Sequence, residues 1–470
     1  MKNFVRLPIR YVLGALLALW GINSAQAQHH ELTSSDTSSS KKMFGTILNS
    51  GKFEFHLRSY FMMTENEPGL LDYSTWGTGA GLGYFSPRWK GIGIGFSGFF
   101  VFRHFENNIT LKDPVTGLSN RYELTLYDVH HPENSRDMDR LEEFFISYEH
   151  EKFSAEFGRQ HFESPLLNAS DNRLRPNLFS GISARFHPEK WTITGSWFTH
   201  LISRGSLEWV PVEESVGFYS TGRNPSGSTE TYTHHLNSKG IGVFGVEYKE
   251  SDFSLKLWSY LAEGILATSF VEGVKMIALK NETKAILGIQ GFYQTALGDG
   301  GNPDPEKAYT LPGEKTFGIG LRSGILWGSN QFTLNYLGIS DQGRFLFPRE
   351  WGREQFFVSM QRERYEGLGG VHGVNLMYEK TVHEHLKLAL GAGHVYTPDL
   401  ENTVLNKYGL PDYFHFTGLI DYRFGGFFKG LDLQFLLAYK GENTGPEVPK
   451  EYVINRVNMA NLNLILDYRF

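Results

Sequence analysis

The chain has 470 residues and a formal net charge of −6, with no cysteine, 52 glycines and an aromatic fraction of 15%. The absence of cysteine excludes a disulfide scaffold, a thiolate metal site and a cysteine nucleophile. The acidic balance argues against nucleic acid as a partner. The mean hydropathy of −0.31 excludes a helical transporter, which needs several apolar runs of roughly 20 residues. A large β-rich or α/β protein remains.

The first residues have the pattern of an export signal. Basic residues within the first ten positions precede an apolar run over residues 11–20, and Ala25-Gln26-Ala27 matches a small-residue cleavage pattern. This order is typical of a secretory signal peptide, and the apolar run is too short to span a bilayer. We therefore expect a cleaved signal peptide at 1–27, a polar leader at 28–50 and a folded region at 51–470.

Apolar and polar residues alternate with a period of two along the rest of the chain. Over residues 431–440, one face carries Leu431, Leu433, Phe435, Leu437 and Tyr439, and the other carries Asp432, Gln434 and Lys440. Because side chains alternate across a strand, each such segment has one apolar and one polar face. Two folds fit this pattern, namely a soluble β-sandwich and a transmembrane barrel with its apolar face outside.

Three features favour the barrel. The chain is expected to be exported, and its apolar segments often end in Tyr, Trp or Phe, as the aromatic girdles of membrane barrels do. The chain also ends on an alternating strand whose last residue is Phe470, which resembles the assembly signal of bacterial outer-membrane proteins. We therefore predict an all-β fold, a transmembrane antiparallel β-barrel in the outer membrane of a diderm bacterium.

The alternating segments number eighteen, with sixteen strands as the alternative. They begin near residues 51, 75, 91, 139, 153, 179, 191, 238, 252, 267, 283, 315, 330, 368, 385, 413, 430 and 458. This count places the short turns at one end and the long loops at the other, and a barrel of this size leaves an aqueous lumen. The apolar patch Phe356 to Met360 could be a nineteenth strand, but it would reverse every later strand. We therefore assign it to a loop over 340–367.

One stretch resembles the third-loop region of the OprD-type substrate-specific porins. It runs from Gly158 to Phe186 and contains Gly158-Arg159-Gln160, Asp171-Asn172-Arg173, Pro176 and Phe179-Ser180-Gly181. A looser similarity covers Pro348 to Glu354. The resemblance implies an eighteen-stranded monomeric barrel whose third and seventh external loops fold inward and narrow the pore. It also implies uptake of small carboxylate-bearing solutes, with arginines binding the carboxylate.

The resemblance and the alternation together supply the candidate site residues. For the pore constriction, the resemblance implies Asp171, Arg173, Arg175, Arg344, Arg349, Glu350 and Arg353. A guanidinium forms bidentate, charge-assisted hydrogen bonds to a carboxylate, although the same residues could instead pair to hold a folded loop. The alternation places a mixed set of charges on the inner wall. Its basic members are Arg58, Lys256, Arg322, Lys387, Arg423, Lys440 and Arg469, and its acidic members are Glu54, Asp421, Asp432 and Asp467.

The function that follows is passive uptake of small polar or carboxylate-bearing solutes through a charged constriction. The alternatives are a surface adhesion or structural barrel and, less favoured, an outer-membrane hydrolase, for which no Gly-x-Ser-x-Gly motif is present. We expect no enzyme activity, no cofactor and no metal site, since His383 and His385 have no third ligand nearby in sequence. The expected partners are solutes, outer-membrane lipids and, through the strand ending at Phe470, the barrel-assembly machinery.

Overall fold

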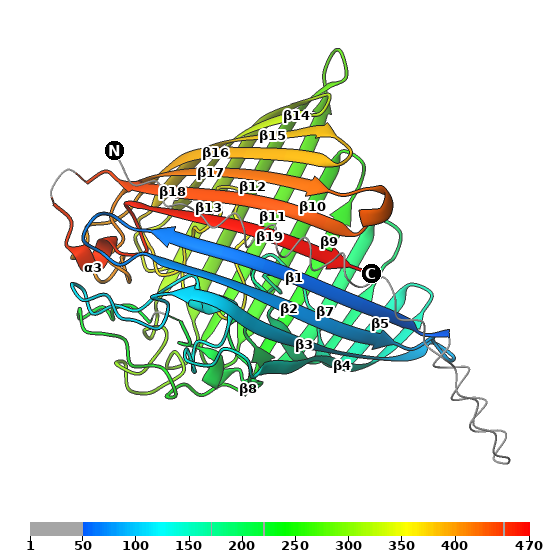
Figure 1. Cartoon of the computed structure of the whole chain (residues 1–470), viewed down its shortest axis with the longest axis horizontal. Helices are drawn as coiled ribbons and strands as arrows, with labels where there is room; N and C mark the ends of the chain where they lie inside the picture. The colour runs from blue at the N-terminus through cyan, green and yellow to red at the C-terminus, as the bar shows by residue number, and fades with distance from the viewer. Residues whose placement is uncertain (1–49, 171, 220, 445–446) are drawn as a thin grey trace. The chain divides into compact units, whose positions relative to one another are not determined.

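The computed structural model describes residues 50–470 except 171, 220 and 445–446. The predicted signal peptide and almost all of the predicted leader lie outside these residues and stay predictions. In the described region the chain forms a closed antiparallel β-barrel (Figure 1). No helix within that region is both long enough and apolar enough to span a membrane.

The ring consists of long strands joined in sequence order. Its members are β1 (Lys52–Glu65), β2 (Tyr73–Phe85), β3 (Ile92–Asn107), β4 (Met138–His150), β5 (Phe153–Gln160), β6 (Leu178–Phe186), β7 (Trp191–Ile202), β9 (Ile241–Lys249), β10 (Phe253–Ala262), β11 (Leu266–Ala278), β12 (Thr283–Ala296), β13 (Lys315–Trp327), β14 (Asn330–Ile339), β15 (His372–His383), β16 (Leu386–Tyr396), β17 (Tyr413–Arg423), β18 (Leu431–Glu442) and β19 (Met459–Arg469). Short elements occupy the connections, namely η1 (Leu124–Leu126), β8 (Val210–Pro211), η2 (Glu213–Ser215), η3 (Gly426–Phe428) and α3 (Lys450–Val453).

The barrel closes where the first strand meets the last. β1 pairs antiparallel with both β2 and β19, with Met62 opposite Asn463 at the seam. β7 pairs directly with β9, and β8 adds only two residues to one edge of β7, outside the ring. The ring therefore has eighteen strands within the described residues, which confirms the predicted count over the alternative of sixteen. The patch Phe356 to Met360 is not a strand, as predicted, and lies in a loop.

The outward faces of the strands are apolar and exposed. On β13, Phe317, Ile319 and Leu321 are 42%, 50% and 48% exposed, whereas Thr316 on the opposite face of the same strand is buried. A soluble sandwich would bury its apolar face in a core. Exposure of the apolar face in strand after strand is instead the arrangement of a barrel surrounded by lipid, so the sandwich alternative is wrong.

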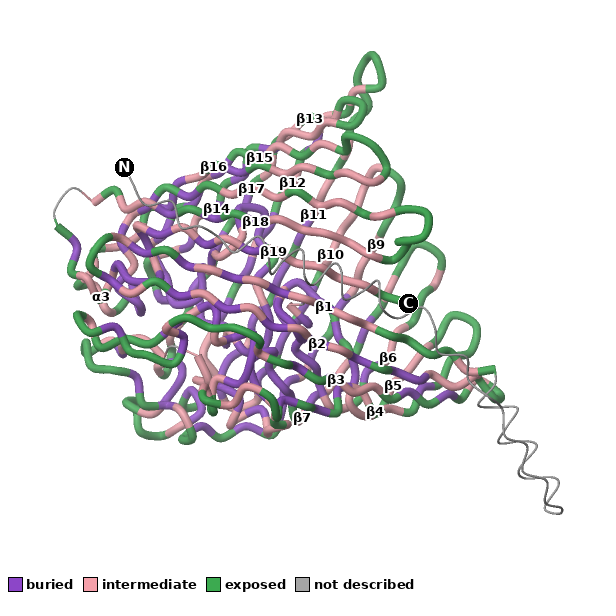
Figure 2. The backbone as a smooth tube through the Cα atoms, viewed as in Figure 1, coloured by how far each residue is buried: buried purple, intermediate pink, exposed green. Residues whose placement is uncertain are grey.

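Long loops gather at one end of the barrel and short turns at the other. The loops used below are L2 (108–137), L3 (161–177), L4 (203–240), L6 (297–314), L7 (340–371), L8 (397–412) and L9 (443–458). Figure 2 shows that buried residues concentrate toward the loop end, inside the ring, while the turn end is mostly intermediate or exposed.

L3 and L7 fold into the lumen, as the resemblance implied. Arg58 of β1 donates to the carbonyl of Arg173 in L3 at 2.7 Å. On the opposite wall, Gln290 of β12 donates to the carbonyl of Gln355 in L7 at 3.1 Å. These wall residues lie near the middle of their strands, so both loops reach deep into the barrel.

The two loops also bind each other. The Asn168 side chain donates to the carbonyl of Arg353 at 2.8 Å and accepts from its N–H at 3.0 Å. The N–H of Gln355 donates to the carbonyl of Pro165 at 3.0 Å. We call this set of hydrogen bonds the L3–L7 clasp. These bonds provide partners for backbone N–H and carbonyl groups of the two loops, which lie outside any strand and would otherwise be buried without a hydrogen bond.

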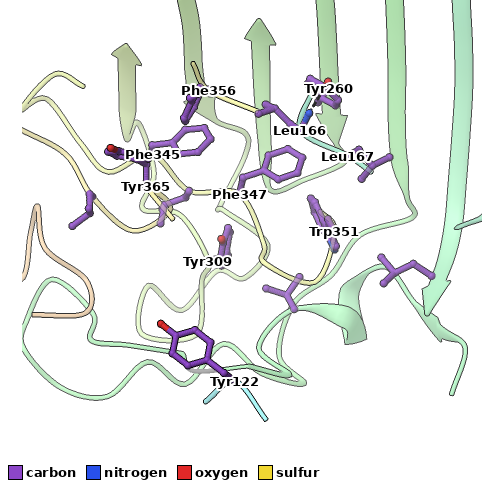
Figure 3. Packing of buried hydrophobic residues seen from close by; sticks show 14 of the residues in the cluster. Tyr122, Leu166, Leu167, Tyr260, Tyr309, Phe345, Phe347, Trp351, Phe356 and Tyr365 are labelled. Atoms are coloured by element: carbon purple, nitrogen blue, oxygen red, sulfur yellow. Dashed lines mark hydrogen bonds between the residues drawn. The ribbon is translucent and has the colours of Figure 1, made fainter. Parts of the chain in front are cut away.

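An apolar cluster anchors the clasp against the wall. Figure 3 shows Trp351, Phe347 and Phe356 of L7 beside Leu166 of L3 and Tyr260 of β10. The indole of Trp351 is fully buried and donates to Ser215 Oγ of L4 at 2.8 Å. Burial of large aromatic side chains contributes most of the stabilisation in such a cluster, so the loops have a core of their own inside the barrel.

The barrel wall beside L3 is tightly packed at a glycine of β5. Gly158 of β5 has φ +128°, and a Cβ there would lie 2.3 Å from the carbonyl oxygen of Phe144. We expect Gly158→Ala to destabilise the barrel by about 1–3 kcal/mol, because backbone atoms must move apart. The measurement is the urea midpoint at which heat-modifiable gel mobility is lost. Gly195→Ala is the control, since a Cβ there meets nothing within 4 Å, and an equal loss in both variants would contradict the argument.

Candidate functional site

A cavity of about 410 Å³ lies among the loops L2, L3, L4, L7 and L9. Its described lining contains one acidic residue, Glu363, and eight arginines contributed by five loops. We call this cavity the arginine chamber, after Arg121 (L2), Arg173 (L3), Arg204 (L4), Arg349, Arg353, Arg362 and Arg364 (L7) and Arg456 (L9). Tyr122, Phe218 and Tyr219 complete its aromatic lining.

The arginines on the L3 side are held by neutral oxygens. Arg173 Nε donates to Thr125 Oγ1 at 2.8 Å, and its NH1 donates to the carbonyl of Asn172 at 2.9 Å. Arg204 NH1 donates to Ser170 Oγ and to Asn172 Oδ1, both at 2.7 Å. These bonds fix the positions of the guanidinium groups without neutralising their charge.

The L7 arginines fall into two kinds. Arg349 pairs with Glu366 at 2.7 Å and Arg364 pairs with Glu354 at 2.9 Å. Arg362, in contrast, donates to Asn461 and Asn463 of β19 at 2.7 and 2.6 Å, and Arg353 donates to the carbonyl of Met360. Only the first kind is charge-compensated by a carboxylate within the described structure.

The remaining two cations lie against tyrosine rings. The Arg121 guanidinium lies 5.5 Å from the ring centre of Tyr122, in cation–π range. Arg456 donates to the carbonyl of Tyr408, and its guanidinium lies 5.9 Å from the Tyr452 ring centre. Both side chains therefore keep their charge available to the chamber.

Burial, and to a smaller extent neighbouring cations, lowers the pKa of two chamber arginines. Burial, with a further contribution from Arg364, lowers the pKa of Arg353 to about 10. Burial, with Arg121 and Arg349 nearby, lowers the pKa of Arg456 to about 9. Both values lie above neutral pH, so these two guanidinium groups remain charged at neutral pH.

Glu363 stays ionised at the edge of the chamber. Its carboxylate accepts from the N–H of Met360 at 3.0 Å and from the Tyr413 hydroxyl at 3.2 Å, and lies 3.1 Å from His415 Nδ1. Burial opposes ionisation, but the hydrogen bond and charge of His415 outweigh it and lower the pKa of Glu363. In the described part of the chain, no group of three His, Asp or Glu residues could hold a metal ion.

A second cavity adjoins the chamber. It has a volume of about 390 Å³, and its lining includes Glu163, Asn168 and Ser170 of L3 and Glu354, Gln355, Phe356 and Ser359 of L7. Asn172 and Arg353 line both cavities. These two residues therefore stand between the two spaces, one on L3 and one on L7.

The predicted constriction residues divide into two groups. Arg173, Arg349 and Arg353 line the arginine chamber, and Asp171 lies outside the described residues. The others are buried where loops meet. Arg175 donates to the carbonyl of Tyr127 at 2.7 Å, Arg344 lies 3.3 Å from Glu314 and 3.6 Å from Glu230, and Glu350 accepts from the N–H groups of Gly217 and Tyr219 at 3.2 and 3.0 Å.

Several predicted wall residues make contacts within the lumen. Arg58 pairs with Asp467, Lys256 lies 2.8 Å from Glu272, and Arg322 donates to Asn335 at 2.7 Å and lies over the Phe357 ring of L7. Lys440 lies over the Tyr413 ring. Nearer the turns, Lys387 is opposite Asp421, Arg423 is opposite Asp432, and Arg469 donates to Asp467. Basic and acidic residues are thus neighbours at several positions on these strands.

Five arginines of the chamber were not among the sequence candidates. Arg121, Arg204, Arg362, Arg364 and Arg456 lie on L2, L4, L7 and L9, outside the two segments that carry the resemblance. Long irregular loops have no periodicity that predicts which side chains converge. The one sequence feature that could have indicated them is that several long loops at the same end of the barrel contain arginines.

Comparison with known proteins gives a clear result for the fold only. No family model matches the chain, and no curated protein matches it. Solved structures do match. OccK9 (OpdG) of Pseudomonas aeruginosa has a TM-score of 0.70 at 14% identity, and OpdK of the same organism, determined with vanillate, has 0.68 at 13%, each covering 90% of this chain and 99% of the other. OccAB2 of Acinetobacter baumannii has 0.69 at 13%, covering 91% and 99%. The similar structures are outer-membrane porins of the OccK/OprD type.

Glu366 provides a test of how the loops around the chamber are held. It accepts from Arg349 at 2.7 Å and Tyr408 at 2.8 Å, and lies 3.6 Å from the fully buried Lys407 of L8. We expect Glu366→Gln to leave two buried cations without a counter-charge and to cost about 3–5 kcal/mol of loop stability. Proteolysis of the folded protein should then cut L7 or L8, while Glu401→Gln, an exposed change on L8, should not increase cutting.

The same carboxylate gives a pH dependence. Burial opposes its ionisation, but Lys407 and Arg349 outweigh burial and lower the pKa of Glu366. A lowered folded-state pKa means that the stabilisation is complete above the ordinary carboxyl pKa and is lost as pH falls through the folded value. We expect loop proteolysis of the native protein to stay low at pH 5 and to rise below about pH 4. Loosening that begins near neutral pH would contradict this assignment.

Proposed function

We propose that the protein is an outer-membrane channel for passive uptake of small carboxylate-bearing solutes, with a constriction between L3 and L7. The observation that carries the proposal is the arginine chamber inside a closed barrel with an apolar exterior. The proposed role is not enzymatic. A single barrel is the proposed functional unit, because the ring and its loops already enclose the whole chamber.

The exterior supports a membrane location. Apolar side chains exposed around the ring would be costly in water and are favourable in lipid. The predicted signal peptide is consistent with export. The similar solved structures are outer-membrane porins, which supports the outer membrane as the proposed location.

The interior supports selection by charge. Cations concentrated in a narrow, low-dielectric space raise the local concentration of anions. A guanidinium then holds a carboxylate by charge-assisted hydrogen bonds, which in an aqueous lumen are weak enough to allow release. A solute complex is known for two of the similar proteins, OpdK with vanillate and OccK2 (OpdF) with glucuronate, and both solutes carry a carboxylate.

Arg353 and Asn172 are the proposed constriction. They belong to both cavities, so a solute that moves from the chamber to the second cavity passes between them. Arg353 would bind the carboxylate at this point, and the L3–L7 clasp holds its backbone on Asn168. The wall residues Arg58 and Arg322 would continue the basic path toward the turn end.

Ion selectivity tests the constriction. In a planar bilayer with a KCl gradient, we expect discrete current steps with a reversal potential of the anion-selective sign. Arg353→Ala should reduce the anion-to-cation permeability ratio several-fold, because one charge is removed from the narrowest point. Arg136→Ala removes the same charge from an exposed site on L2 and should leave the ratio unchanged. Cation selectivity in the wild type would overturn the proposed charge preference.

Solute uptake tests the selectivity for carboxylates. In proteoliposome swelling, we expect butyrate to enter faster than butyramide, which has nearly the same size but no charge. Arg353→Ala should bring the two rates closer together by slowing butyrate. Equal rates for the two solutes in the wild type would exclude a carboxylate-selective constriction, and absence of swelling with any solute would exclude an open channel.

A further inference from the structure

We infer that the arginine chamber binds small solutes that carry two or more carboxylates in preference to monocarboxylates. This inference deepens the proposed function, on which it rests for the choice of carboxylates, because it names the solute class of the same site. It follows from the number of uncompensated cations, from their arrangement on several loops and from their mutual repulsion.

Most of the chamber's arginines form no ion pair with a described carboxylate. Among the described residues, the chamber's two arginine–carboxylate pairs are Arg349 with Glu366 and Arg364 with Glu354. The others contact only neutral oxygens or aromatic rings within that part of the chain, namely Arg121, Arg173, Arg204, Arg353, Arg362 and Arg456. One carboxylate has two oxygens and can engage one guanidinium in a bidentate manner or bridge two. A monocarboxylate therefore leaves most of this charge unbalanced.

The cations repel one another. Arg362 is among the groups that lower the pKa of Arg173, Arg204 and Arg353, after burial. Like charges in a partly desolvated space carry an unfavourable energy that is much larger than in bulk water. Each further carboxylate on a bound solute reduces this repulsion, so we expect affinity to rise with the number of charges and not only with contact area.

The cations also surround the cavity. Arg121 of L2 and Arg362 of L7 both lie near the Tyr122 ring, at 5.5 and 5.9 Å from its centre. Arg204 comes from L4 and Arg456 from L9. A solute with several carboxylates can therefore contact several loops at once. After the first contact, the remaining ones form within a single complex, at a high effective concentration.

Direct binding measurements test the inference without requiring transport. Isothermal titration of the folded full-length protein in detergent, at neutral pH, would use butyrate, glutarate and propane-1,2,3-tricarboxylate, which differ in carboxylate number. We expect the affinity to rise about tenfold at each step, or about 1.4 kcal/mol, because each added carboxylate can form charge-assisted hydrogen bonds with a further guanidinium. Addition of salt should weaken the tricarboxylate most, because the interaction is screened.

Arg121→Gln is the variant of choice. The Arg121 side chain makes no hydrogen bond or ion pair with any described residue, so its replacement breaks no polar contact of the fold. We expect it to weaken tricarboxylate binding about tenfold and to leave butyrate binding within a factor of about three. The double variant Arg121→Gln/Arg456→Gln should weaken it further. Arg136→Gln is the matched control on the same loop and should bind all three acids as the wild type does.

The outcomes separate this inference from the proposed function. Equal affinities for the three acids, or unchanged tricarboxylate binding in both chamber variants, would overturn the inference, even if the bilayer shows an anion-selective channel. A silent bilayer together with graded binding that depends on Arg121 would support the inference and overturn the transport role. Heat-modifiable mobility of every variant shows that the barrel is folded in each titration.

Discussion

Every other feature of this molecule depends on closure of the hydrogen-bonded ring. A backbone group without a partner is very costly in hydrocarbon, so a sheet in a membrane must have no free edge. Pairing of β1 with β19 removes the last free edge of the sheet. In the closed ring, the apolar side chains of each alternating strand point outward and the polar side chains point inward. The polar face encloses a space, and that space makes a luminal site possible.

Buried side chains fill the interior of this barrel mainly at the loop end. At the loop end, L3 and L7 bring aromatic side chains and buried ion pairs into the lumen, so this region is packed like the core of a soluble domain. Two kinds of buried arginine result. Those paired with carboxylates, such as Arg349, hold loops together, whereas those held by amides and carbonyls, such as Arg362, have no carboxylate partner among the described residues. The kind of hydrogen-bond partner, carboxylate or neutral oxygen, therefore distinguishes the structural arginines from the proposed binding arginines better than burial does.

The ring was predictable from the sequence and most of the chamber was not. The predicted strand starts near 153, 191, 283, 315, 330 and 413 coincide with the observed ones, and the largest difference is at β15, which begins at His372 rather than near 368. Lipid on one side and water on the other impose a period of two that a single sequence displays. No such rule governs long loops. Arg175 and Arg121 are both loop arginines, yet one is buried on the Tyr127 carbonyl and the other lines the chamber, because tertiary contacts decide the outcome.

The L3–L7 clasp has a consequence for how the proposed channel could change. L3 follows β5 and L7 follows β14, so the two loops start from widely separated parts of the wall and meet through the Asn168–Arg353 hydrogen bonds. In the proposed channel, the width of the constriction would therefore be set by the two loops and not by the circumference of the ring. A chimera that received only L7 from a similar barrel would present a foreign backbone to Asn168. Exchange of L3 and L7 together would transfer the proposed constriction with its clasp intact. The strands of the wall could then stay unchanged while L3 and L7 change together, so the barrel and the proposed constriction could evolve separately.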